Sequence, residues 1–367
     1  MGKIRLDWVD IAKGIAILAV VILHTDYHFP NTAFMPINAL IGGSWHVAAF
    51  FMIGGFFLNE EKLSKPKPFI VGKFKSLYLL AAYFYVPAVL LHNFFISWGW
   101  YDTSIVYGGK IVAENTPPQL VKSLIATLLC AGREPILGAV WFVYSLFLAL
   151  CMMSLLSWGV NRVTSNASNS KIYAISLLII CIFSCTLTRY VGINIPRFNN
   201  TLTAMWLIYV GFWLRNKTKV DFSNKWGFII SLLVFLHFCM TPPQGVTMNA
   251  NKYTDVITLT VGTVSALYVI CYLSIKLQGS VVGSALRKCG QESFYIMVLQ
   301  FVGFKIGVYI LSYLGYNLPL AQLLAPTENK LHLMVYFVVT GALFPIAFMW
   351  TFRKVKVTAL QMLNRIV

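Results

Sequence analysis

Long apolar runs recur along this chain, and each is about as long as a helix that crosses a membrane. A helix of about 20 residues spans a hydrocarbon core of roughly 30 Å. Windows of about 19 residues place such runs at 8–28, 38–58, 72–97, 137–159, 171–190, 200–215, 226–241, 255–277, 292–315 and 331–352. The sequence therefore predicts an all-α polytopic membrane protein, a bundle of about ten transmembrane helices.

The composition agrees with this class. Of the 367 residues, 58% are hydrophobic and only 11% are charged, whereas a soluble chain carries about 25% charged residues. This excludes a soluble enzyme, a disordered chain and a secreted disulfide scaffold. The cysteines lie mostly in apolar surroundings and include no CxxC pair, so we expect neither disulfides nor a metal site. We interpret residues 1–367 as one integral-membrane domain with no separate soluble domain.

The formal net charge of +17 would indicate nucleic-acid binding in a soluble protein. Here the basic residues lie in short loops between apolar runs, and most of these loops are expected on the same side of the membrane as the N-terminus. This is the pattern that sets membrane topology. We therefore expect both termini to be cytoplasmic and no nucleic-acid partner. Within the longest loop, 98–136, the apolar segment 119–131 is short and contains Lys122. We interpret it as an interfacial or re-entrant helix.

The first apolar run carries the ionisable residues Asp10, Lys13 and His24. Such groups are costly inside a membrane and therefore need a partner or a function. Asp10 and Lys13 are three residues apart and can pair on a helix surface. Lys13 and His24 share a face and lie about 16 Å apart along the axis at 1.5 Å per residue. A histidine suits proton transfer near neutral pH, and a lysine suits an anion. The alternative for Lys13 is a lysine that extends its ammonium group to the membrane interface. The alternative for His24 is a histidine that only forms a hydrogen bond between helices.

Five motifs carry a resemblance to the membrane acyltransferase-3 family. In its first helix, ten residues separate an arginine or lysine from a histidine, as between Lys13 and His24. Its second motif resembles HVAAFFMIGGFFL, which begins at His46, although Ala48 replaces a proline and Gly54 a serine.

The remaining three motifs lie farther along the chain. Lys73 and Lys75 in FIVGKFKSLYLL stand where the family has arginines, and Trp141 in GAVWFVYSLF is similar to its Trp-Phe-Leu motif. GQESFYIMVLQF is similar to its late motif, but Gln300 replaces the usual histidine. The order and spacing of the motifs match from residue 5 to about 352.

The resemblance implies O-acylation of a cell-envelope glycan or its lipid-linked sugar precursor in the bacterial inner membrane, with acetyl-coenzyme A as the acyl donor. It implies His24 as general base and a basic stretch, Lys73 and Lys75, for the donor's phosphates near Lys13. Lysine acts there as a point charge without arginine's bidentate geometry. Trp141 is a candidate for stacking on the sugar or the donor, although an aromatic residue at the end of a membrane helix is more often a plain interface anchor.

The partner that orients His24 is left open by the sequence. Asp10 lies fourteen residues away, about 21 Å along a helix, and is too distant. The candidates are His46, Glu134 and Gln300; a local pair with Arg133 is the alternative for Glu134. Two other functions also remain: a transporter or flippase for a glycan or small anion, since charged residues line such paths too, and a subunit of a polysaccharide-export complex.

Overall fold

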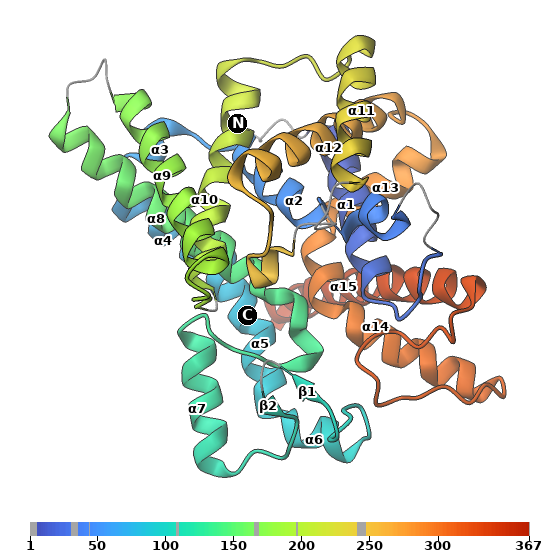
Figure 1. Cartoon of the computed structure of the whole chain (residues 1–367). Coiled ribbons are helices and arrows are strands. Elements are labelled where there is room, and N and C mark those ends of the chain that lie inside the picture. The colour runs from blue at the N-terminus through green and yellow to red at the C-terminus, as the bar shows by residue number, and fades with distance from the viewer. Residues whose placement is uncertain are drawn as a thin grey trace.

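The computed structural model describes residues 6–30, 36–43, 45–107, 110–164, 169–195, 197–240 and 247–366. Helices dominate this part of the chain (Figure 1). The α-helices are α1 (Asp7–Leu23), α2 (His46–Gly55), α3 (Glu60–Leu63), α4 (Pro66–Lys73), α5 (Leu79–Leu90), α6 (His92–Ser97), α7 (Pro117–Leu128), α8 (Trp141–Val163), α9 (Asn169–Arg189), α10 (Phe198–Phe212), α11 (Lys225–Met240), α12 (Val256–Lys276), α13 (Val281–Gln291), α14 (Ser293–Tyr313) and α15 (Leu331–Ile366).

Shorter elements join them. They are the π-helical turns η1 (Ala39–Gly43), η2 (Phe74–Tyr78) and η4 (Trp213–Lys217), the 3₁₀ turns η3 (Pro135–Val140) and η5 (Met248–Ala250), and the strands β1 (Val106–Tyr107) and β2 (Lys110–Ile111). The two strands form a small antiparallel hairpin in which Val106 is opposite Ile111.

Each of the ten predicted runs contains a helix, and the all-α class is confirmed. Among the described residues, six helices are long and apolar enough to cross a membrane: Pro66–Leu90, Pro135–Val163, Ser170–Arg189, Val256–Lys276, Ser293–Tyr313 and Leu331–Thr358. The other runs form shorter helices. The 15 residues of α10, for example, measure about 22 Å at 1.5 Å per residue. The count of ten spans and the cytoplasmic termini therefore stay predictions.

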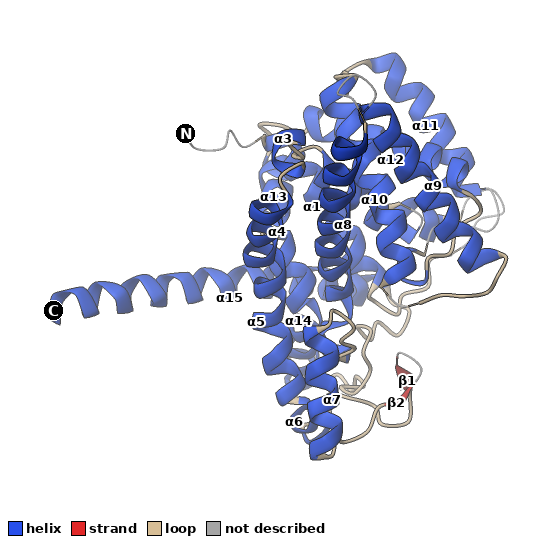
Figure 2. Ribbon diagram, turned by 90° about the vertical axis from the view of Figure 1, so that its left-hand side faces the viewer, coloured by secondary structure: helices blue, strands red, loops and turns tan. Residues whose placement is uncertain are grey.

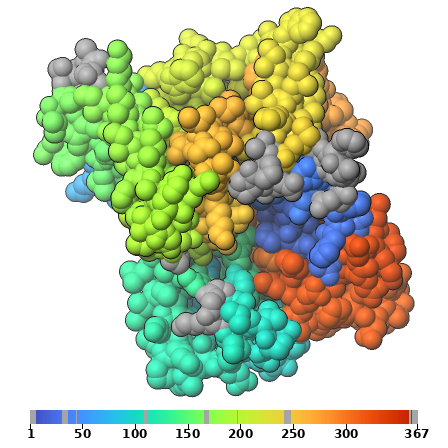
Figure 3. Space-filling model, viewed as in Figure 1, coloured from blue at the N-terminus to red at the C-terminus, as the bar shows by residue number. Residues whose placement is uncertain are grey.

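The predicted run at 72–97 needs a correction at both ends. Its helix begins earlier, at Pro66, where proline occupies the first turn and its fixed φ favours helix initiation. It ends at Leu90, and α6 follows after a break at Leu91. The short apolar segment at 119–131 is α7, which lies with α6 and the hairpin in a lobe at the lower edge of the molecule (Figures 1 and 3).

Helix α1 runs through the centre of the packing. One set of its side chains, including Val9 and Ala16, belongs to a core formed with α2, α8, α10 and α12. Ile17, Val20 and Val21 belong to a second core formed with α5, η3, α14 and α15. The polar residues of α1 are therefore held between two apolar cores.

Two glycines let α1 and α13 approach closely. A Cβ atom on Gly14 would lie 2.0 Å from the Leu286 carbonyl oxygen, and one on Gly290 would lie 1.7 Å from the Asp10 carbonyl oxygen. Small residues at such contacts let helix backbones pack tightly inside a membrane.

Helix α15 extends beyond the bundle. Its C-terminal part projects sideways, transverse to α4 and α8 (Figure 2).

Candidate active site

A cavity of about 720 Å³ opens beside α1. Its wall contains four of the predicted site residues, Lys13, His24, His46 and Trp141. These residues come from α1, from the start of α2 and from the start of α8. The rest of the wall is mainly apolar, with Phe50, Phe142, Met297 and Phe301 among its side chains. The fold thus places a few polar groups in one apolar pocket, as ligand sites usually do.

His24 lies at the C-terminal end of α1 and is held by α14. Its Nδ1 is 3.2 Å from Oε1 of Gln300, a residue with no exposed surface. The Phe301 ring packs edge-on against the imidazole, with ring centroids 4.9 Å apart. The residue that orients His24 is therefore Gln300, which the sequence offered only as one of three candidates.

The Gln300 amide determines the tautomer of His24. The amide nitrogen of Gln300 donates to the Met297 carbonyl oxygen at 3.1 Å, so its oxygen must face His24. An amide oxygen only accepts hydrogen bonds. His24 therefore carries its proton on Nδ1, and Nε2 is the basic ring nitrogen. A histidine held in one tautomer by a second residue is the arrangement found in general-base catalysis.

Lys13 also lines this cavity. Its Nζ lies 3.2 Å from Asp10 Oδ1, and the two side chains are 28% and 3% exposed, respectively. Nζ also lies 5.5 Å from the centroid of the Phe57 ring, where a cation is attracted to the aromatic face. Asp10 itself is not part of the cavity wall.

His46 lines the cavity but is not bonded to His24. Its Nδ1 donates to the Gly42 carbonyl oxygen, four residues earlier. Its orientation is therefore set locally, by the turn that precedes α2. Trp141 lies at the start of α8, with the Arg197 guanidinium 5.9 Å from the centroid of its ring.

Lys73 and Lys75 lie outside the cavity wall. Nζ of Lys73 is 5.3 Å from the Phe69 ring centroid, and Lys75 is exposed. Leu77, in the following turn, does line the cavity. The structure thus brings Lys13, His24, His46 and Trp141 together, and it keeps the two lysines on the neighbouring helix surface.

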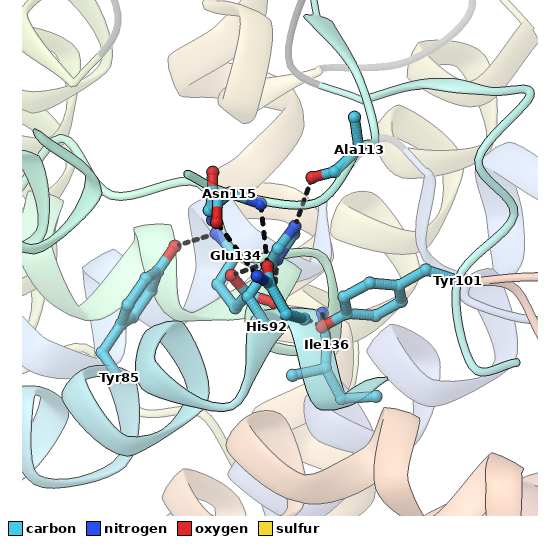
Figure 4. Close-up of polar contacts among 8 residues, drawn as sticks. Tyr85, His92, Tyr101, Ala113, Asn115, Glu134 and Ile136 are labelled. Atoms are coloured by element: carbon cyan, nitrogen blue, oxygen red, sulfur yellow. Dashed lines mark hydrogen bonds and ion pairs between the residues drawn. The ribbon is translucent and has the colours of Figure 1, made fainter. Parts of the chain in front are cut away.

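Glu134 belongs to a separate buried cluster beside α6 (Figure 4). Both carboxylate oxygens lie 3.1 Å from Nδ1 of His92, and Oε1 also accepts a hydrogen bond from the Tyr101 hydroxyl. The backbone N–H of Glu134 donates to the Tyr85 hydroxyl at 2.7 Å. Glu134 therefore does not orient His24.

This cluster lies next to the cavity wall in the chain. His92 also donates from Nε2 to the Ala113 carbonyl oxygen at 3.0 Å, which fastens the segment after the hairpin to α6. Glu134 directly precedes η3, whose Gly138 and Ala139 line the cavity. No local sequence pattern points to His92, because its partners are 21 and 42 residues away in the chain.

The His92–Glu134 pair predicts a pH-dependent stability. Both ring nitrogens face acceptors, so the bonded form is the imidazolium. Burial opposes this charge, but the hydrogen bond and the charge of Glu134 outweigh burial and raise the pKa of His92 above its usual value of 6.5. When folding raises the pKa of a histidine, the protonated histidine stabilises the folded protein. This stabilisation is complete at a pH below the pKa of the histidine in the unfolded chain, and it is lost as the pH rises through the pKa of the histidine in the folded protein.

We therefore expect His92→Gln to unfold at a lower temperature than wild type at pH 6, with a loss of about 1.5–3 kcal/mol in the free energy of unfolding, the usual range for a hydrogen bond to a charged group. The difference should shrink at pH 9. Thermal unfolding of the detergent-solubilised protein at both pH values measures it. A difference that is equal at pH 6 and pH 9 would contradict an imidazolium at this position.

The loop between α14 and α15 covers the His24 end of the cavity. The Ala325 N–H donates to the His24 carbonyl oxygen, and the Asp26 N–H donates to the Ala325 carbonyl oxygen, both at 3.0 Å. The Asp26 carboxylate accepts hydrogen bonds from the Thr327 N–H at 2.7 Å and from the Gln322 amide at 2.9 Å. These bonds hold Leu323 and Leu324 in the cavity wall.

These features define a class. The described part of the chain has six apolar helices of membrane length, so the protein is a multi-pass membrane protein. An oriented histidine and a lysine lie in the wall of a largely apolar cavity in it. A family model described as an acyltransferase domain matches residues 6–355. The chain therefore belongs to the acyltransferase-3 family and is a membrane acyltransferase, which confirms the resemblance seen in its motifs. No curated protein and no solved structure matches it.

Proposed function

We propose that the protein transfers an acetyl group from acetyl-coenzyme A to a sugar hydroxyl of a cell-surface polysaccharide or of its lipid-linked precursor, in the bacterial inner membrane. One observation carries the proposal: His24, oriented by Gln300 at 3.2 Å, lines the same cavity as Lys13. A base and a cation in one pocket suit a reaction between a neutral hydroxyl and an anionic donor.

His24 acts as the general base in this proposal. Its Nε2 takes the proton of the sugar hydroxyl while the hydroxyl oxygen attacks the thioester carbonyl carbon. The tetrahedral intermediate then collapses, the carbon–sulfur bond breaks, and the imidazolium returns the proton to the departing thiolate. The products are the sugar ester and free coenzyme A. A general base of this kind typically accelerates a reaction 10²–10⁴-fold.

The donor follows the length of α1 in this proposal. Lys13, restrained by Asp10, faces the donor's anionic part, and Lys73 and Lys75 on the adjacent helix surface attract the phosphates of the nucleotide before it enters. The flexible pantetheine arm occupies the cavity between Lys13 and His24, which are about 16 Å apart along the helix axis. His46 and Trp141 line the space where the thioester meets the sugar.

The full-length protein in nanodiscs tests this function. With acetyl-coenzyme A and a bacterial surface glycan, we expect acceptor-dependent release of free coenzyme A, and mass spectrometry should detect one acetyl increment on the glycan. A transporter would move the glycan without releasing coenzyme A, and a scaffold subunit would do neither. Propionyl-coenzyme A in a parallel reaction measures the preference for acetyl.

A further inference from the structure

An arginine beside two residues of the cavity wall has no acidic partner in the part of the chain that the structure describes. Arg197 directly precedes α10. Its guanidinium carbon lies 5.9 Å from the Trp141 ring centroid, and its Nη1 donates to Asn249 Oδ1 at 3.3 Å. Both of these neighbours line the cavity. Nε of Arg197 is buried and has no hydrogen-bond partner within the described part of the chain.

Burial lowers the pKa of the Arg197 guanidinium, and the charge of a second arginine, Arg133, lowers it further, whereas the side chains of Tyr85, Tyr107 and Cys130 raise it. The carboxylate of Glu134 is already bonded to His92 and Tyr101. No carboxylate among the described residues forms an ion pair with Arg197.

The neighbours of Arg197 share one cavity with His24. The Phe301 ring packs on His24, and a Cβ on Gly138 would lie 3.7 Å from Phe301 and 2.8 Å from the Tyr107 hydroxyl. Tyr107 lines the cavity, as do Trp141 and Asn249, the two residues beside the guanidinium. The proposed base and the neighbours of the guanidinium thus belong to the same wall.

A partly buried guanidinium is normally paired, because an uncompensated charge away from water is costly. Its planar fork matches the oxygens of a phosphate or a carboxylate. On the basis of the function proposed above, we infer that the acceptor sugar carries an anionic group and that Arg197, beside Trp141 and Asn249, binds that group while His24 deprotonates the hydroxyl. The group is the phosphate of a carrier-linked sugar or the carboxylate of a sugar acid.

Three acceptors test this inference: a methyl glycoside, the corresponding sugar 1-phosphate and the corresponding uronic acid. We expect Arg197→Gln to raise KM for a charged acceptor about 10- to 100-fold, the usual effect of losing a hydrogen bond to a charged group, with kcat little changed. KM for the neutral glycoside should not change. Arg197→Lys should recover part of the loss. The charged sugar whose KM rises in Arg197→Gln identifies whether the anionic group is a phosphate or a carboxylate.

Arg189→Gln is the matched control. Arg189 ends α9, donates to the Thr254 carbonyl oxygen and lies over the Tyr190 ring. Neither of these neighbours lines the cavity, so the replacement of Arg189 should leave every KM unchanged. Equal losses on the neutral and charged acceptors in Arg197→Gln, or no loss at all, would overturn the inference.

Direct binding separates this inference from the proposed function. Calorimetry with the sugar 1-phosphate or the uronic acid, without acetyl-coenzyme A, should show weaker binding to Arg197→Gln than to wild type even if no acyl transfer occurs. If Arg197→Gln does not fold, Asn249→Ala removes the neighbouring contact and should weaken the charged acceptor alone. Binding that is unchanged in these variants would refute a role for Arg197.

Discussion

Replacement of His24 by alanine is expected to lower the rate of acetyl transfer 10²- to 10⁴-fold, the range that a general base contributes. The variant loses the imidazole that Gln300 orients in the cavity wall, while α1 keeps its packing against both cores. The measurement is the initial rate of coenzyme A release with saturating glycan acceptor in nanodiscs, compared with wild type at equal protein concentration.

His332→Ala is the matched control for this experiment. His332 is exposed on α15 and does not line the cavity, so this variant should transfer at the wild-type rate. Size-exclusion chromatography should give the same elution profile for both variants and wild type. A His24→Ala protein that retains near-normal transfer would refute His24 as the base.

The second large effect is expected at Gly290. Gly290→Ala places a Cβ 1.7 Å from the Asp10 carbonyl oxygen and 2.9 Å from the Gly14 nitrogen. These are backbone atoms, so α1 and α13 must move apart. Such overpacking costs about 1–3 kcal/mol and sometimes more. We expect a clearly lower unfolding temperature for the detergent-solubilised protein.

The same substitution should also reduce activity. Because α1 carries Lys13 and His24, a shift of this helix displaces both residues from the substrates, and a misplacement of about 1 Å costs up to about 10²-fold in rate. The coenzyme A release assay measures this effect on the folded fraction of the protein.

Gly159→Ala is the matched control for Gly290→Ala. Gly159 lies in α8, and an added Cβ there meets nothing within 4 Å. Alanine favours helix over glycine by about 0.5–1 kcal/mol, so this variant should be as stable as wild type or slightly more stable. If the two variants behaved alike, the close approach of α1 and α13 would not be essential.

Several features of this protein follow from local sequence. Apolar runs of membrane length predicted the helices, because a helix must satisfy its own backbone hydrogen bonds inside a membrane. Helical periodicity placed Asp10 beside Lys13, and the structure has their charged atoms 3.2 Å apart. The motifs indicated the family, which the match over residues 6–355 establishes. Each of these inferences depends on residues that are close together in the chain.

The contacts that complete the site depend instead on how distant segments pack. Gln300 reaches His24 across 276 positions, and Glu134 bonds to His92 rather than serving His24. Periodicity gives the face of a helix on which a residue lies, but it does not give the rotation and depth at which two helices meet. Those are determined by close contacts such as Gly290 against Asp10. The sequence by itself therefore determined the membrane class and the polar residues of the first helix, and only the tertiary structure decided which side chains share the cavity and which residue orients the histidine.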